Sequence, residues 1–330
     1  MLTVTLYYRE GCVRCDEVRQ DLLALQATIP HRLVEVNIDA ETALKSSFDL
    51  SIPVVEVGPY RLRSPFGQKD LQVALQAAQD RLLHYEQVGD KRFQEKMERG
   101  HTLSGEDRVS GWFANHYMLI FNLAFLIYSG APFLAPVLMK VGMTAPAKII
   151  YTIYSPLCHQ LAFRSWFLFG EQAAYPSALA GVPWLKTYEQ VTGLSFTDVL
   201  DARAFIGNEV LGYKVAYCER DVAIYCAILL FGLIFSATGR KLKSIPWYVW
   251  VVIGILPIAI DGFSQLPDLL GMNFPAWVPM RESTPFLRTL TGFLFGFFTA
   301  WYGFPLIEQS MLETRRMLAQ KIAVVTQTQR

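Results

Sequence analysis

The strongest constraint on this chain is a set of long stretches that contain no acidic or basic side chain. A helix needs about 20 mostly apolar residues to cross the ~30 Å hydrocarbon core of a bilayer. A charged side chain inside that core is costly. The later two-thirds of the chain therefore predicts an all-α transmembrane bundle. The uncharged stretches are Val109–Met139, Val222–Gly239, Ser244–Ile260 and Thr289–Ile307.

We expect one membrane-spanning helix in each stretch, at about 114–138, 220–238, 246–266 and 287–307. A fifth apolar stretch, Ile149–Phe163, is shorter and is followed by Arg164. Its length fits a re-entrant or interfacial helix better than a span. The membrane domain is therefore expected to cover 109–310, with four spans.

Basic residues predict how the spans are oriented. The clusters Arg240–Lys243 and Arg315–Lys321 follow the second and fourth spans, and such clusters favour the cytoplasmic side. Four spans then place both termini in the cytoplasm, including a tail at 311–330. Residues 145–216 become an extracytoplasmic cap. The chain is expected to be a multi-pass protein of the cell membrane, with the lipid bilayer as a partner.

Charge balance and the first residues exclude two other classes. The 330 residues contain 30 basic and 29 acidic side chains, so no basic field indicates a nucleic-acid partner. The chain starts without a basic segment ahead of an apolar one, and Arg9 and Glu10 interrupt the first apolar run. We therefore expect no secretory signal, and a cytosolic N-terminal part.

The first 80 residues predict a small α/β domain. Leu2–Tyr8, 32–38 and 51–57 are rich in β-formers and are expected to be strands. Helices are expected after Cys15, at 41–48 and from Asp70 onward, which gives a mixed α/β order. Residues 81–108 are charged, with helical propensity, and are expected to be a helical linker to the membrane domain.

Two cysteines directly follow the first predicted strand, in the sequence Gly11-Cys12-Val13-Arg14-Cys15. A C-x-x-C beside a βαβ pattern in a cytosolic segment is typical of a redox dithiol. The first cysteine falls at a helix N-terminus, where the dipole favours the thiolate. Arg14 favours a thiolate as well.

This segment resembles the glutaredoxin-like branch of the thioredoxin superfamily over residues 1–80. The second element of the resemblance is Ser51-Ile52-Pro53-Val54, which looks like the family's cis-proline before the third strand. The resemblance implies that Cys12 attacks, that Cys15 resolves, and that Pro53 helps to dock the partner. A thioredoxin- or glutathione-like thiol donor would then be a cytosolic partner. A zinc half-site and an inactive docking domain stay open as alternatives.

The membrane half contains four polar blocks against an apolar background. In the four-span arrangement they converge on the extracytoplasmic ends of the spans. Asp261 and Gln265 share a helix face, and Arg288 is the expected ion-pair partner of Asp261. Ionisable groups in spans mark functional sites, although this pair could instead only pin two helices. The blocks are Cys158-His159-Gln160 with Arg164, Cys218-Glu219-Arg220-Asp221, Asp261-Gly262 with Gln265, and Glu282-Ser283-Thr284 with Arg288, Thr291 and Gly292.

Together these blocks resemble an uncharacterised prokaryotic multi-span membrane family. The shared patterns are Cys-His-Gln, Cys-x-Arg, Asp-Gly-x-x-Gln and Arg-x-x-Thr-Gly, over about 120–307. The resemblance implies a fold and no established activity. The insert Glu171–Val215 departs from the family pattern and is expected to belong to the cap.

Three interpretations of Cys158, His159 and Cys218 stay open. The two cysteines could form a redox disulfide, tuned by Arg164 or Arg220. They could bind zinc or copper with His159 and an acid from Glu219, Asp221 or Asp261. They could also form a structural disulfide in the cap.

We interpret the chain as a membrane-tethered thiol-disulfide oxidoreductase, an enzyme that passes reducing equivalents between the cytosolic dithiol and membrane or extracytoplasmic thiols. Because thiol exchange needs contact and a bilayer is ~30 Å thick, a quinone-like carrier is one way to join the two sites. The alternative is a metal-binding transporter or membrane-embedded enzyme, with zinc as the metal and the N-terminal domain as a regulatory or docking module. A structural anchor is the third hypothesis.

Overall fold

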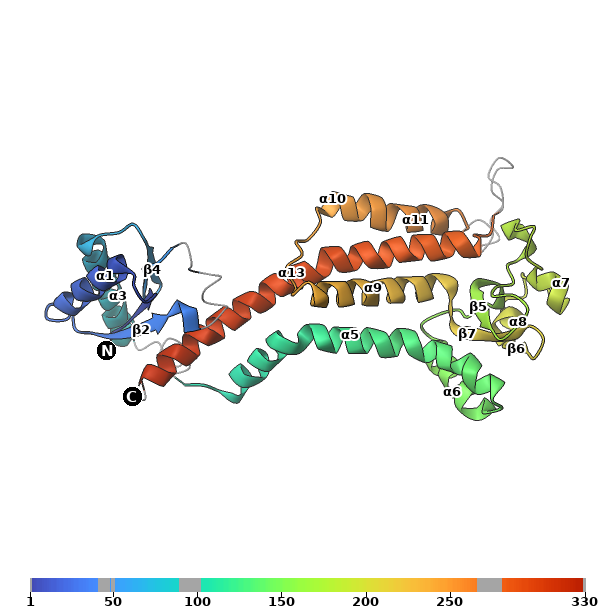
Figure 1. Cartoon of the computed structure of the whole chain (residues 1–330), viewed down its shortest axis with the longest axis horizontal. Coiled ribbons are helices and arrows are strands. Elements are labelled where there is room, and N and C mark those ends of the chain that lie inside the picture. Colours follow the sequence, from blue (N-terminus) through green and yellow to red (C-terminus); the bar gives the residue numbers. More distant parts are fainter. Residues whose placement is uncertain (1, 41–47, 49–50, 89–101, 266–280, 329–330) are drawn as a thin grey trace. The chain divides into compact units, whose positions relative to one another are not determined.

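The computed structural model describes residues 2–40, 48, 51–88, 102–265 and 281–328. They form two compact units, one of residues 1–116 with 309–330 and one of residues 117–308. Most of the helix predicted at 41–48 and part of the linker predicted at 81–108 lie outside the described residues. Figure 1 draws the whole chain, and each unit is described by itself.

The first unit contains a four-stranded mixed sheet of order β2-β1-β3-β4. Strand β1 pairs in parallel with β2 and antiparallel with β3, and β3 pairs antiparallel with β4. The parallel pair requires a crossover, which helix α1 (Val13–Leu25) supplies. This arrangement confirms the predicted α/β domain. The strands are β1 (Leu2–Tyr8), β2 (His31–Asn37), β3 (Val54–Val57) and β4 (Tyr60–Arg63).

Both faces of this sheet are covered. Alternate strand residues point to opposite faces, so Val55 and Val57 join one hydrophobic cluster while Val54 joins the other. Helices α1 and α3 (Gln68–Val88) cover the first face. The end of α13 contributes Ala319 to the second cluster, beside Tyr7 and Val34 of the sheet. A helix that starts in the second unit therefore ends as part of the first unit's core.

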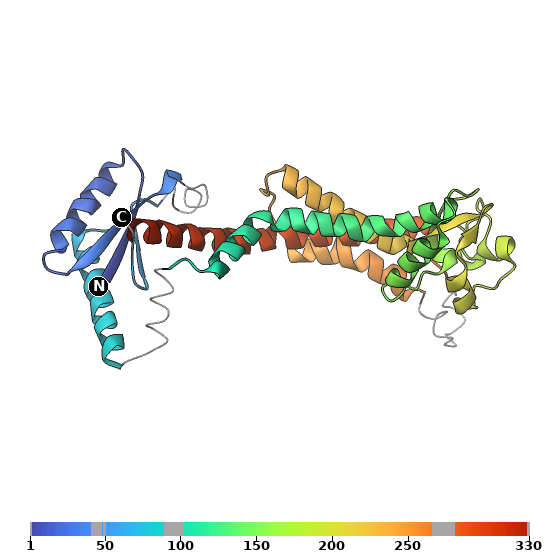
Figure 2. The same cartoon turned by 90° about the horizontal axis from the view of Figure 1, so that it is seen from below.

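The second unit contains long apolar helices that run side by side in both views (Figures 1 and 2). Three helices of the described chain have the length and composition to cross a membrane. Asn122 of α5 donates to the Gly232 carbonyl of α9, and Phe231 of α9 packs against Phe304 of α13. The three are α5 (Gly105–Lys140), α9 (Glu219–Ala237) and α13 (Pro285–Thr328).

The fourth predicted span falls on a shorter helical run. It consists of α10 (Trp247–Val249), the π-helical η4 (Trp250–Ile255) and α11 (Leu256–Phe263). The apolar run is Trp247–Phe263, and at 1.5 Å a residue it is ~25 Å long. Pro257 has no N–H to donate, which accounts for the departure from α-helical bonding just before it. A count of four spans stays a prediction.

Helices α9 and α13 approach each other at two glycines. A Cβ built on Gly296 would lie 2.2 Å from the Ile224 carbonyl oxygen, and one on Gly292 would lie 2.6 Å from that of Arg220. No side chain fits at those distances. The backbones of α9 and α13 therefore pack closely at Gly292 and at Gly296, one turn further along α13.

The short elements between α5 and α9 form a cap at one end of the helices (Figure 1). The helix expected at Ile149–Phe163 is wrong in extent: α6 begins at Thr144 and ends at Tyr154. Pro156 is consistent with this end, because it has no N–H with which to continue the helical hydrogen bonds. The other elements are β5 (Ser165–Leu168), α7 (Tyr188–Thr192), α8 (Val199–Ala204), β6 (Gly207–Asn208), β7 (Gly212–Cys218) and short 3₁₀ turns at Ala162–Arg164 and Ala178–Ala180.

A small antiparallel sheet of order β5-β7-β6 organises the cap. Ser165 of β5 lies opposite Cys218 of β7. Strand β7 ends at Cys218 and α9 begins at Glu219, so no loop separates the sheet from the helix. The sheet thereby positions the cysteine block at the mouth of α9.

Candidate functional site

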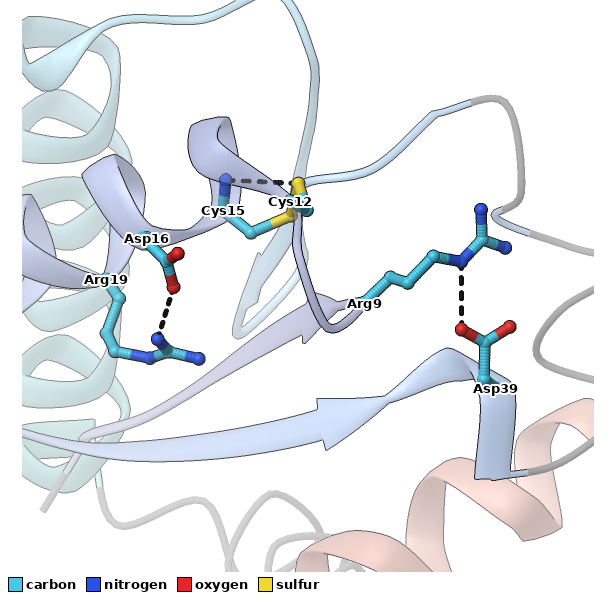
Figure 3. The surroundings of a disulfide bond; sticks show 6 residues. All are labelled: Arg9, Cys12, Cys15, Asp16, Arg19 and Asp39. Carbon is cyan, nitrogen blue, oxygen red and sulfur yellow. Dashed lines mark hydrogen bonds and ion pairs between the residues drawn. A yellow bond between two sulfur atoms is a disulfide. The ribbon is translucent and has the colours of Figure 1, made fainter.

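The N-terminal cysteines lie at the start of α1 (Figure 3). Cys12 is the N-cap residue, and its sulfur accepts the Cys15 N–H at 3.2 Å. The two residues form a disulfide with their Cα atoms 5.3 Å apart. Cys12 is half-buried, whereas Cys15 is 1% exposed. The outer sulfur therefore suits attack on a partner, and the inner one suits ring closure.

Charged side chains close in sequence surround this disulfide. Arg14 donates to Glu17 at 2.8 Å and to the Phe66 carbonyl at 2.9 Å. Figure 3 also shows the ion pair of Arg9 with Asp39, 2.9 Å apart. The Arg14 guanidinium is thus fixed at the first turn of α1, where its positive charge adds to the helix dipole.

Pro53 is buried and directly precedes β3. The Ile52–Pro53 peptide bond is cis, as the sequence predicts, and the Pro53 carbonyl accepts the Ser64 N–H at 3.3 Å. A second cis bond joins Ser64 to Pro65. The docking role of Pro53 stays a prediction.

Cys158 and Cys218 come together in the cap as free thiols. The Cys218 N–H donates to the Cys158 sulfur at 3.3 Å. The Cys218 thiol donates to the Asp221 carboxylate at 3.1 Å. The ligand atoms of Cys158, Cys218 and Asp221 all lie within 4.8 Å of one another. This group can therefore form a disulfide after oxidation or hold a metal ion.

His159 does not join that group. Its side chain is exposed, unlike Cys158 beside it, and the ligand cluster found among the described residues has Asp221 in its place. Of the predicted metal set of Cys158, His159, Cys218 and an acid, His159 is therefore wrong, and Asp221 is the acid that lies with the two cysteines.

Gln160 ties the cysteine block to the sheet. Its backbone has a φ of 54°, which is uncommon for a residue with a side chain. In this conformation its amide donates to the Tyr151 carbonyl at 2.9 Å and to the Ala216 carbonyl at 3.0 Å. Gln160 thus joins α6 to β7 and holds the adjoining cysteine segment in place.

Asp261 is the centre of a buried polar network and is 4% exposed. It pairs with Arg220, and Arg281 lies 3.5 Å from it. The Ser283 hydroxyl lies 2.8 and 2.9 Å from its two oxygens. Gln265 donates to the Asp261 carbonyl. The Asp261 carboxylate is therefore contacted from two other segments of the chain, the start of α9 and residues 281–283.

Arg288 occupies the neighbouring part of the network and is 2% exposed. It pairs with Glu282, lies 4.0 Å from Glu219, and donates to the Gln265 side chain at 3.1 Å. Arg164 pairs with Glu282 at 2.7 Å. The predicted ion pair of Asp261 with Arg288 is therefore wrong. Asp261 pairs with Arg220 and Arg288 pairs with Glu282, while Gln265 forms hydrogen bonds to both Asp261 and Arg288. The structure describes all eight residues of the predicted polar site, and His159 is the one whose side chain is exposed. The eight are His159, Gln160, Arg164, Arg220, Asp221, Asp261, Gln265 and Arg288.

Lys214 is a buried cation that the sequence reasoning missed. It is 1% exposed, and its ammonium donates to the Gln160 carbonyl at 2.8 Å and to the Arg203 carbonyl at 2.6 Å. Burial lowers the pKa of Lys214 to about 7. The available signal was a single lysine directly before the apolar residues Val215, Ala216 and Tyr217.

Comparison with known proteins finds a family match in each half of the chain. Residues 3–80 match the family described as Glutaredoxin-like domain (DUF836). Residues 202–302 match the family described as Predicted membrane protein (DUF2085). An uncharacterized protein of Methanocaldococcus jannaschii is 28% identical over 197 residues, which are 58% of this chain and 92% of the relative. No solved structure matches the chain.

These matches confirm the predicted fusion. The first unit carries a glutaredoxin-like domain with a thioredoxin-like fold, and the second carries a membrane domain that associates with a lipid bilayer. The archaeal relative is uncharacterized, so it brings no activity to the chain.

Proposed function

We propose that this fusion of a glutaredoxin-like domain with a membrane domain is a membrane-tethered thiol-disulfide oxidoreductase. The observation that carries the proposal is the geometry of Cys12 and Cys15. Cys12 caps α1 with its sulfur toward the first-turn N–H groups, and Cys15 closes the disulfide from one turn inside. Such a position stabilises a thiolate.

The reaction is a two-electron exchange. The Cys12 thiolate attacks one sulfur of a partner disulfide, which releases one partner thiolate and leaves a mixed disulfide. The Cys15 thiolate then attacks the Cys12 sulfur and releases the second partner thiolate. The Cys12–Cys15 disulfide forms as the partner is reduced, and a cytosolic dithiol or two glutathione-like thiols restore the reduced enzyme.

Cys158 and Cys218 are the proposed second redox pair. Their oxidation removes two electrons and two protons and forms one disulfide. Asp221 accepts a hydrogen bond from the Cys218 thiol, so it is placed to take that proton. A quinone accepts two electrons and two protons, and it is the class of carrier that joins two dithiols without direct contact.

The test is thiol trapping in the full chain, in native membranes. The Cys15→Ser variant keeps the attacking sulfur and should accumulate mixed disulfides, whereas Cys12→Ser should not. The redox state of Cys158 and Cys218, measured by labelling from each side of the membrane, should shift toward the oxidised form in Cys12→Ser. An unchanged redox state would remove the relay, and labelling from the same side as Cys12 would remove the proposed orientation with both termini in the cytoplasm.

A metal centre is the second candidate, because Cys158, Cys218 and Asp221 converge. Two sulfurs and a carboxylate suit zinc, with a fourth position open. In this case the domain would act as a metal-binding transporter or membrane-embedded enzyme. Zinc that co-purifies with the full chain and is absent from Cys158→Ser supports it, and reversible oxidation of both thiols in the metal-free chain supports the redox relay instead.

A further inference from the structure

A cavity of about 430 Å³ opens in the cap, and its lining includes no cysteine and no residue of the Asp261 network. Helix α6 and its C-cap residue contribute four residues of one face to it, at the spacing i, i+3, i+4 and i+7. Its lining includes three cationic side chains, Lys148, Arg203 and Lys214, and no acidic one. The remaining lining residues are Tyr151, Thr152, Ser155, Gln160, Leu200, Ala204 and Ile206.

Lys214 lies in the wall of this cavity with an unbalanced charge. Two of its three ammonium protons go to backbone carbonyls, which are neutral acceptors. Among the described residues no carboxylate forms an ion pair with it. A buried charge is costly unless an opposite charge accompanies it. The structure therefore provides one free donor and one positive charge at a site where a ligand can supply the counter-charge.

Arg203 and Lys148 add to the same field. One nitrogen of Arg203 is held by the Ser155 carbonyl at 3.0 Å and by the Ser155 hydroxyl, so the guanidinium is oriented before a ligand arrives. Arg203 is half-buried and Lys148 is exposed. The cations thus extend from the protein interior to the surface, which gives an anion an attractive path inward.

We propose that this cavity binds an oxyanion, a phosphate or sulfate group, held by Lys214, Arg203 and Lys148. Guanidinium and ammonium groups form charge-assisted hydrogen bonds to such oxygens. The Ser155 hydroxyl, which accepts a hydrogen bond from Arg203, provides a further donor in the lining. The lowered pKa of Lys214 fits this role, because a bound anion restores the proton that burial disfavours.

This site is separate from the proposed redox chemistry, since it uses neither cysteine pair. The oxyanion can be a free ion or the head group of an anionic lipid, because both present the same oxygens. The elements that form the cavity are α6, α8 and β7, all within the second compact unit. An anion that binds only the folded cap would stabilise the packing of these three elements against one another.

The test is titration of the detergent-solubilised full chain with inorganic phosphate and with sulfate, followed by calorimetry. We expect saturable binding that weakens at least tenfold in Lys214→Met and several-fold in Lys148→Met. Lys186→Met is the matched control, because Lys186 is an exposed cap lysine that pairs with Glu171. Its affinity should be unchanged.

Two further arms complete the experiment. Lys148→Met and Arg203→Gln keep the test valid if Lys214→Met fails to fold, because Lys148 is exposed. Native mass spectrometry of the chain from nanodiscs of phosphatidylcholine, with and without phosphatidic acid, separates the sources. Retention of phosphatidic acid that Lys148→Met reduces assigns a lipid head group, and binding of free phosphate alone assigns a soluble ion. Equal binding by the parent chain and all cavity variants in both arms would overturn the proposal.

Discussion

The Cys218 thiol donates a hydrogen bond to the Asp221 carboxylate, with sulfur and oxygen 3.1 Å apart. The Asp221 N–H in turn lies 3.5 Å from the same sulfur. Cys218 therefore caps α9 in the way that Cys12 caps α1. The chain places a cysteine at the N-terminus of a helix twice, with a second cysteine in contact each time.

The metal-binding hypothesis makes a prediction about Asp221 and His159. Titration of the metal-free, reduced chain with Co²⁺ should produce thiolate-to-metal charge-transfer absorption. Asp221→Asn should weaken Co²⁺ affinity about tenfold or more, because a ligand is lost. His159→Ala is the control and should leave the affinity unchanged, since its side chain is exposed. The reverse pattern would contradict the ligand set.

A second prediction concerns the buried Arg288. Arg288→Met removes the nearby cation of Glu219, which is 1% exposed, and leaves Glu282, which is 4% exposed, with Arg164 as its cation. Removing one partner of a buried pair costs about 3–5 kcal/mol, so the thermal midpoint in detergent should fall sharply. Exposed Arg63→Met serves as the control. The double variant Glu282→Gln/Arg288→Met should lose less than the two single losses added, and strict additivity would exclude direct coupling.

A third prediction compares two glycines of α13. Gly296→Ala places a methyl group 2.2 Å from the Ile224 carbonyl oxygen, whereas a Cβ on Gly303 meets no atom within 4 Å. Overpacking costs about 1–3 kcal/mol, so Gly296→Ala should lower the thermal midpoint. Gly303→Ala should hold or raise it, because alanine favours a helix over glycine by about 1 kcal/mol. Equal midpoints would argue against the close packing of α9 and α13.

The fourth prediction is the pH dependence of sulfate binding in the cavity. Burial lowers the pKa of Lys214 to about 7, so the free protein loses this positive charge as the pH rises through 7. The ammonium form attracts the anion, and affinity should therefore be highest near pH 6 and fall toward pH 9. Sulfate is the suitable probe because it does not titrate in this range. The other groups that face the site are Lys148, Arg203, Tyr151 and Cys158.

Calorimetry at several pH values measures this effect directly. Between pH 7 and 8, binding should be accompanied by proton uptake, since the bound anion raises the pKa of Lys214. Tyr151 does not contribute, because burial raises its pKa. Lys214→Met should abolish the pH dependence, and a dependence that survives this variant would assign it to another group.

The sequence predicted the elements whose signals are local. The strand before Cys12, the helix after it and the three long apolar helices follow from β-formers, helix starts and gaps in charge. The cap sheet could not be predicted, because β6 has two residues and β5 has four, too few for an alternating pattern. The partners of Asp261 could not be predicted either, since they depend on how the helices rotate and on the segment at Arg281 and Ser283.

The pairing of β5 with β7 determines which way Cys218 faces. Ser165 lies opposite Cys218 in this register, and successive strand residues point to opposite faces. A slip by one residue would turn the Cys218 sulfur away from Cys158 while leaving every residue of the block in place. Cys158 and Cys218 are thus necessary for the thiol contact, but the register of the sheet brings them together. Insertions and deletions in the loops between the strands should accordingly be tolerated. An insertion of one residue within β5 or β7 should not be, because it would turn the Cys218 side chain to the other face.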